Sequence, residues 1–95
     1  MKLWVDDIRP APAGYVWVKS VNEAKRVLLE AEEQNATIEV LDLDHDAGDY
    51  AADGGDYIRL LDWLAETGRK YPIRLHTANP VGRANMQRLM DRYLV

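Results

Sequence analysis

The sequence has no cysteine, so disulfides, thiolate metal sites and thiol nucleophiles are excluded. A chain without cysteine suits a reducing compartment. It also has no long hydrophobic run, since no apolar stretch approaches the about 18 to 20 residues that cross a bilayer. The first residues, MKLWVDD, reach two acids before the apolar region of a signal peptide could develop. We therefore expect a soluble, cytoplasmic protein with no membrane partner.

An excess of positive charge is also missing. The chain has 12 lysines and arginines against 16 aspartates and glutamates, which gives a formal net charge of -4. This balance argues against a broad nucleic-acid-binding face, but it leaves room for a local basic pocket that holds one phosphate. The 95 residues are enough for one domain, which we expect to span residues 1–95.

The first half of the chain predicts two strands and a helix. Residues 2–5 read as a short apolar strand that runs into two aspartates. Residues 8–14 (IRPAPAG) contain two prolines and a glycine, which predicts a loop. Residues 15–19 carry the aromatic and β-branched side chains that are typical of a strand. Ser20 and Glu23 then match a capping box, and apolar residues follow at helical spacing.

The second half predicts two further strands, each followed by a helix. Residues 38–43 are nearly continuously apolar, as in an inner strand, and residues 58–66 have the apolar spacing of a helix. Residues 72–75 predict the last strand. Asn79 can then cap a final helix, with Pro80 in its first turn. The resulting order, β-β-α-β-α-β-α, predicts an α/β fold with a parallel sheet flanked by helices.

Acidic residues gather where the third predicted strand ends, in VLDLDHDAGD (residues 40–49). Carboxylates this close repel one another unless a cation or a set of hydrogen-bond donors meets them. In open α/β sheets the ligand lies beyond the carboxyl ends of the strands. Three clusters should meet there: Asp6 with Asp7, Asp44 with Asp46, and His76 with Thr77 and Asn79. Any one cluster alone is also explained by turns and helix caps.

Both histidines of the chain, His45 and His76, fall in these clusters. A histidine can give or take a proton near neutral pH, which favours a catalytic role. The alternative is that each histidine bridges neighbouring carboxylates, with Asp46 or Asp42 orienting a ring. His45 lies between two acids on a predicted strand, so its side chain can instead face a flanking helix.

A phosphate ligand would need positive charge or free N–H groups near these acids. Arg9 and Arg83 are the nearest cations in the sequence. The amino-terminal end of the last predicted helix is an anion site in many proteins, and Gly82 would permit close approach there. Alternatively, Arg9 neutralises the aspartates and Arg83 is solvated. Mg2+, or Mn2+ in its place, prefers oxygen ligands and would suit the carboxylates of Asp6, Asp7 and Asp44.

The acidic pair after the first strand, an acid after the third, and HTA after the fourth resemble the receiver domain of response regulators. The resemblance implies that Asp6 and Asp7 are metal ligands, and we also count Asp44 and Asp46 among the candidate metal ligands. Asp44 would occupy the phosphoacceptor position, for which Asp42 competes, and the Thr77 hydroxyl would contact a phosphoryl group. The expected fold is then a truncated receiver-like (flavodoxin-like) three-layer α/β fold of about four parallel strands and three helices.

The chain departs from an ordinary receiver in two ways, because it has no helix between the first two strands and no fifth strand with its lysine. The strings DDIRPAP, LDHD and HTANPVGRANM resemble a small receiver-like group, the cyclic-phosphate processing receiver domains. That resemblance implies metal-dependent processing of phosphate esters, and of RNA 2',3'-cyclic phosphate ends in RNA repair. His76, Asp44 and His45 would be catalytic, while Thr77, Asn79, Arg83, Arg9 and Gly82 would bind phosphate.

Two other functional interpretations remain open. The chain could be a receiver-derived regulatory or phospho-ligand-binding module without turnover. The Asp-x-Asp spacing also resembles haloacid-dehalogenase-like phosphatases, although those need further strands and a downstream lysine. We also expect the open edges of a four-stranded sheet to favour a homodimer. The tryptophans Trp4, Trp17 and Trp63 are expected in the core or at its margins, because a small domain needs large apolar side chains.

Overall fold

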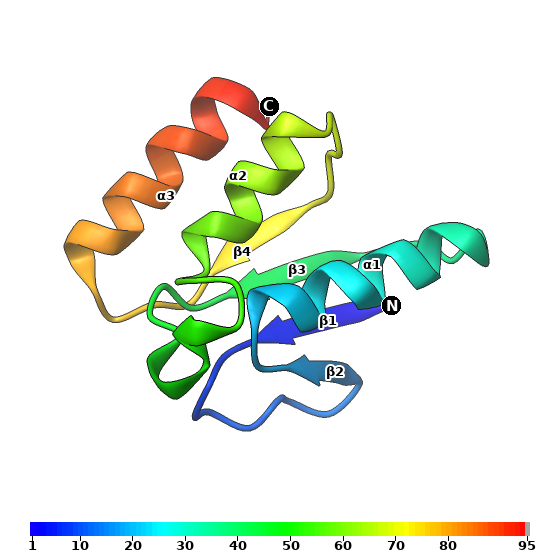
Figure 1. The fold of residues 1–95 in the computed structure, drawn as a ribbon, viewed down its shortest axis with the longest axis horizontal. Helices are drawn as coiled ribbons and strands as arrows, with labels where there is room; N and C mark the ends of the chain where they lie inside the picture. The colour runs from blue at the N-terminus through cyan, green and yellow to red at the C-terminus, as the bar shows by residue number, and fades with distance from the viewer. Residues whose placement is uncertain (95) are drawn as a thin grey trace.

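Figure 1 shows a computed structural model of the chain, which describes residues 1–94. The elements follow the predicted order β-β-α-β-α-β-α. They are β1 (Lys2–Val5), β2 (Tyr15–Val18), α1 (Val21–Glu33), β3 (Val40–Leu43), α2 (Ile58–Glu66), β4 (Ile73–Leu75) and α3 (Pro80–Tyr93). One further element, the 3-10 helix η1 (Gly48–Ala52), lies in the loop after β3 and was not predicted.

The four strands form one parallel sheet in the order β2-β1-β3-β4. The crossovers β2–α1–β3 and β3–α2–β4 both advance across the sheet in the same direction. Right-handed crossovers that advance in one direction place their helices on the same face of the sheet. Helix α3 contacts α2, and Figure 1 shows the three helices gathered on one side of the strands. The fold is a truncated flavodoxin-like α/β fold, as predicted, but with its helices on one face of the sheet it has two layers and not the expected three.

The hydrophobic core fills the space between this sheet face and the helices. Alternate strand residues point into it, among them Leu3 and Val5 of β1 and Leu41 and Leu43 of β3, all fully buried. The helices contribute Val21, Ala24, Leu28, Ala31, Leu60, Leu61, Leu64 and Met86. Burying one such leucine contributes roughly 1.5–3 kcal/mol, so this single layer of contacts is the main source of stability.

The opposite face of the sheet has no helix over it among residues 1–94. Doubly wound folds have helices on both faces. Here residues 8–14, with two prolines and a glycine, take the place of the helix between β1 and β2, so one helical layer is missing. Trp4, Tyr15 and Trp17 lie half-buried on this helix-free face. The expectation for Trp4 and Trp17 was therefore wrong, whereas Trp63 does pack against the core.

The predicted helix starts are confirmed. Ser20 Oγ accepts a hydrogen bond from the Glu23 backbone N–H at 3.0 Å, and α1 begins at the next residue. Asn79 Oδ1 accepts from the Gly82 N–H at 3.0 Å, and Pro80 occupies the first turn of α3. None of the helices within residues 1–94 combines the length and apolar character needed to cross a bilayer.

Candidate functional site

Three of the predicted site residues meet beyond the carboxyl ends of the strands. Asp6 follows β1, Asp44 follows β3 and His76 follows β4. One ligand atom from each lies within 4.8 Å of the others. Backbone hydrogen bonds hold the three strand ends together, because Asp44 N–H donates to Val5 O and His76 N–H donates to Leu43 O, each at 2.9 Å. The parallel sheet thus joins acids that lie far apart in the sequence.

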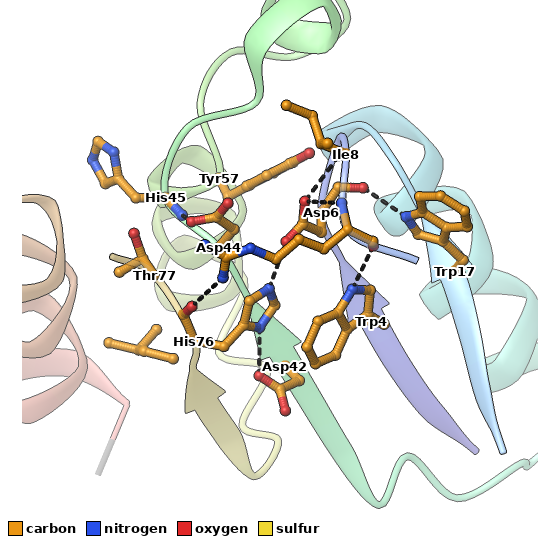
Figure 2. A network of polar contacts seen from close by, with 12 residues as sticks. Trp4, Asp6, Ile8, Trp17, Asp42, Asp44, His45, Tyr57, His76 and Thr77 are labelled. Atoms are coloured by element: carbon orange, nitrogen blue, oxygen red, sulfur yellow. Dashed lines mark hydrogen bonds and ion pairs between the residues drawn. The ribbon is translucent and has the colours of Figure 1, made fainter. Parts of the chain in front are cut away.

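His76 is held between two carboxylates, as Figure 2 shows. Its Nδ1 lies 2.6 Å from Asp42 Oδ1, and its Nε2 lies 2.8 Å from Asp6 Oδ2. The Asp6 side chain is 1 % exposed and that of Asp42 is 10 % exposed. An ionised carboxylate only accepts hydrogen bonds. Both ring nitrogens of His76 therefore face carboxylate oxygens, which hold the ring between Asp42 and Asp6.

Asp6 is the most strongly held acid of the site. Its Oδ1 accepts hydrogen bonds from the backbone N–H groups of Ile8 and Arg9, each at 2.9 Å. Its backbone carbonyl accepts from Trp17 Nε1 at 2.7 Å. Burial disfavours the charged carboxylate, but the hydrogen bonds from Arg9, Ile8 and His76 outweigh it and lower the pKa of Asp6. Asp6 is therefore an ionised group near neutral pH.

Asp7 shows the opposite behaviour. Burial, followed by the charges of Asp6 and Asp44, raises the pKa of its carboxyl. Its Oδ2 approaches Gly48 so closely that a Cβ at that position would lie 2.2 Å away. Gly48 has φ 54°, a left-handed conformation that favours glycine. The turn after β3 therefore presses against the Asp7 side chain, and like charges accumulate where a cation would relieve them.

Tyr57 lies behind this acidic group and is fully buried. Its hydroxyl donates to the Lys19 backbone carbonyl at 2.7 Å. Burial, and then the charges of Asp7, Asp6 and Asp44, raise the pKa of the Tyr57 phenol beyond its ordinary range. The phenol is thus neutral, and its hydrogen bond to Lys19 holds it in place at the back of the site.

Trp4 packs flat against His76. The two ring centroids are 3.8 Å apart and the ring planes differ by 4°. Trp4 Nε1 donates to Arg9 O at 2.9 Å, and Arg9 Nη1 donates to His76 O at 3.0 Å. The stack and these two hydrogen bonds fix the plane of the imidazole, so both of its nitrogens stay directed at Asp42 and Asp6.

His45 and Asp46 belong to a second cluster at the start of α3. Figure 2 shows His45 directed away from His76. The His45 ring lies over Gly82, where a Cβ would be 2.4 Å from the ring, and its Nδ1 is 2.8 Å from Asp46 Oδ1. Asn79 Nδ2 also donates to Asp46, at 3.4 Å, and both hydrogen bonds lower the pKa of Asp46, that from His45 the more. The backbone N–H of Asn79 donates to Thr77 Oγ1 at 3.1 Å.

The two predicted phosphate-binding arginines are placed differently. Arg9 lies at the main site, where its guanidinium donates a hydrogen bond to the His76 carbonyl. Arg83 donates from Nη1 to the Leu75 carbonyl at 3.2 Å, beside β4. Both residues are exposed, so each guanidinium is accessible to an anion from solution. Of the two, Arg9 lies within the hydrogen-bond network of His76 and Asp6.

The donor set at the main site fits a divalent cation. Carboxylate oxygens suit Mg2+ and Mn2+. Asp6 and Asp44 offer oxygens close together, and Asp7 is an acid whose charge its neighbours disfavour. Asp42 meanwhile contacts Nδ1 of His76, on the side of the ring away from Asp6, and so orients the ring.

Sequence reasoning missed the roles of Trp4 and Tyr57. Strand alternation contains the signal for Trp4, because residues two apart on a strand share a face. Trp4 and Asp6 share one face of β1, and Asp42 lies on the same face of β3 in register with Trp4. Nothing comparable in the sequence marks Tyr57, which reaches the acids from the start of α2.

The parallel sheet in the order β2-β1-β3-β4, with acids at its carboxyl edge and HTA after β4, defines a receiver-like α/β domain. The chain belongs to the Cyclic-phosphate processing Receiver domain family, whose sequence profile matches residues 1–92. No curated protein and no solved structure matches the chain significantly.

Proposed function

We propose that this domain is a metal-dependent phosphoesterase that hydrolyses RNA 2',3'-cyclic phosphate ends, in the service of RNA repair. The observation that carries the proposal is the hydrogen-bonded chain Asp42–His76–Asp6 beside Asp44. It combines an oriented proton carrier with carboxylates that suit a divalent cation. The family description, cyclic-phosphate processing, supports the choice of substrate.

The reaction needs two proton transfers. A water oxygen forms a bond to phosphorus, while the bond from phosphorus to one ribose oxygen breaks. The water loses a proton to a base, and the departing ribose oxygen gains one from an acid. The products are a phosphomonoester and a free ribose hydroxyl, so atoms and charge balance. A positioned histidine contributes about 10²–10⁴-fold to such transfers.

In our proposal His76 is the acid that protonates the departing ribose oxygen, and the carboxylate of the neighbouring Asp44 takes the proton of the attacking water. Nδ1 of His76 is committed to Asp42, so the proton at Nε2, which faces Asp6, is the one available to a substrate oxygen. The flat contact with Trp4 restricts rotation of the ring. Preorganisation of this kind lowers the cost of reaching the reactive geometry.

Asp6, Asp44 and Asp7 would hold Mg2+ or Mn2+, which when bound neutralises charge on the phosphoryl oxygens. The Arg9 guanidinium is exposed and lies beside His76, where it can bind a phosphate oxygen. The Thr77 hydroxyl accepts the Asn79 N–H and keeps its own proton for donation. These residues place a phosphate ester next to Nε2 of His76.

Metal binding is the first test. Calorimetric titration of the protein with Mg2+ and with Mn2+ should show saturable binding with one site. Asp44→Asn should abolish this binding, whereas the matched control Asp91→Asn, an exposed acid on α3, should leave it unchanged. If no metal binds, or if both variants bind as the unaltered protein does, the proposed metal site is wrong.

Turnover is the second test. With metal present, the protein should open adenosine 2',3'-cyclic phosphate and an oligonucleotide with that end. His76→Gln should keep the fold and the metal affinity but lose at least 100-fold in kcat. Full turnover in this variant would show that His76 is not the catalyst. Binding of phosphate esters without any turnover by the unaltered protein would replace the enzyme with a phospho-ligand-binding module.

A further inference from the structure

The helix-free face of the sheet borders the candidate site and differs in charge from the rest of the molecule. Every second residue of each strand points to this face. These residues are Lys2 and Trp4 of β1, Tyr15 and Trp17 of β2, Asp42 of β3 and Arg74 of β4. Figure 2 views the sheet from this side, with Trp4, Asp42 and His76 in front of the strands. The face therefore continues directly from the proposed catalytic histidine.

The charges on this face are mainly positive. Lys2, Arg9 and Arg74 are exposed, whereas the two acids on this side of the sheet, Asp6 and Asp42, are buried and both contact His76. Lys2 Nζ lies 5.6 Å from the centroid of the Tyr15 ring, which keeps its ammonium over the face. The whole chain carries a net charge of -4, so this face has the opposite sign of charge to the molecule as a whole. Such a local basic patch attracts an anionic ligand.

The face also offers aromatic surface. Tyr15 and Trp17 are half-buried beside Trp4, on the strand at the edge of the sheet. Aromatic side chains between cations are the composition of surfaces that bind single-stranded nucleic acids. Exposed sheet faces with this composition stack bases while lysine and arginine contact the backbone. A phosphate end held near His76 would direct the preceding nucleotides across this surface.

We infer that the helix-free face, defined by Lys2, Arg9, Tyr15, Trp17 and Arg74, binds the single-stranded RNA that carries the phosphate end. The choice of this ligand rests on the proposed function. A second copy of the chain fits the face less well, because a two-fold axis through it would oppose each group of cations to the same cations of the partner. The charge of the face therefore favours a polyanion over a homodimer.

The dimensions of the face limit the contact to a few nucleotides. Arg74 lies two strands from β1, or about 10 Å, and Lys2 lies two residues from Trp4, or about 7 Å. Three cations spread over this area can neutralise about three phosphates. For single strands the logarithm of affinity should then fall with the logarithm of salt concentration with a slope of about -2.

Oligonucleotide binding without metal tests the inference separately from catalysis. Fluorescence anisotropy would follow a 5'-labelled RNA octamer with an ordinary 3'-hydroxyl end, in EDTA, from 25 to 200 mM salt. The double variant Lys2→Glu with Arg74→Glu should bind at least tenfold more weakly at low salt and show a slope near -0.7. The matched variant Arg26→Glu with Arg88→Glu reverses two exposed charges on α1 and α3 and should bind within twofold of the unaltered protein.

Equal weakening in both double variants, or no binding by the unaltered protein at low salt, would overturn the inference. So would sedimentation showing a dimer that the Lys2→Glu, Arg74→Glu variant dissociates, because the face would then be a subunit interface. Failure of the proposed function has a different signature. The octamer would bind and respond to the face variant, while the cyclic phosphate end would remain intact with Mg2+ or Mn2+ present.

Discussion

At the scale of single residues, the two histidines have different hydrogen-bond partners and therefore different roles. His76 contacts Asp42 and Asp6 through both ring nitrogens, and its ring is covered by Trp4. His45 contacts Asp46 and lies over the first turn of α3. The first arrangement suits proton transfer beside a cation, whereas the second fixes the position of a helix. Of the two histidines, we therefore assign chemistry to His76 alone in the proposed mechanism.

Gly82 offers a sharp test of the packing of His45. A Cβ at Gly82 would lie 2.4 Å from the His45 ring, so Gly82→Ala must displace that ring and strain its bond to Asp46. We expect a loss of about 1–3 kcal/mol in the free energy of unfolding, as overpacking usually costs. Urea denaturation followed by circular dichroism measures it.

The same substitution in a His45→Ala background is the control. Without the ring, alanine is the better helix former at this position, so Gly82→Ala should become neutral or stabilise by up to about 1 kcal/mol. If the cost of Gly82→Ala is the same in both backgrounds, the His45 contact is not its cause.

At the scale of secondary-structure elements, local rules explain where the helices begin. Ser20 and Glu23 form a capping arrangement in which Glu23 Oε1 also accepts the Lys19 N–H at 3.0 Å. Ser20 Oγ donates to Asp53 Oδ2 at 2.6 Å, which ties α1 to the end of η1. The cap therefore joins α1 to η1 through two residues that are 33 positions apart in the sequence.

Replacing Ser20 should weaken this junction. Ser20→Ala removes both the cap acceptor and the donor to Asp53, and loss of a serine cap alone costs about 0.5–2 kcal/mol. We expect thermal and urea unfolding midpoints to fall accordingly. Asp53→Ala keeps the cap and should cost less than Ser20→Ala. A larger loss in Asp53→Ala would mean that the link to η1, and not the cap, carries the stability.

At the scale of the whole molecule, ionised carboxylates that hold distant segments together make stability depend on pH. Hydrogen bonds from Arg69 and Tyr71 lower the pKa of Glu32, which joins α1 to the segment before β4. A hydrogen bond from Ser20 lowers the pKa of Asp53. A carboxyl with a lowered pKa in the folded state stabilises the fold above its unfolded pKa, and this stabilisation is lost as pH falls through the folded pKa.

The protein should therefore become less stable as the pH falls from 7 through the ordinary pKa range of carboxyl groups, about 4. Asp7, whose pKa is raised, contributes with the opposite sign but is one group among several. Urea midpoints at pH 7, 5 and 3 measure the change. Glu32→Gln should be less stable at pH 7 and should show a shallower decline. A midpoint at pH 3 equal to or above that at pH 7 would contradict this account.

The sheet topology explains which parts of the site could be predicted. Asp6, Asp44 and His76 follow three parallel strands, and parallel strands bring their carboxyl ends to one edge, so their meeting follows from the order of elements. The separate position of Asp46 with His45 depends on how α3 packs, which no local pattern specifies. Strand alternation puts Trp4 on the same face as Asp6 and Asp42, but its stacking on His76 depends on side-chain packing across three strands.

The sequence alone determined the element order, the helix caps and the acids at the strand ends, because each depends on residues a few positions apart. The tertiary structure decided the rest. Crossover direction placed α1 and α2 on one face, and α3 packs against α2. Strand register set Asp42 against His76 across 34 residues and Asp6 against His76 across 70. Partners at such separations are chosen by packing and register of the whole sheet, which local propensities do not encode.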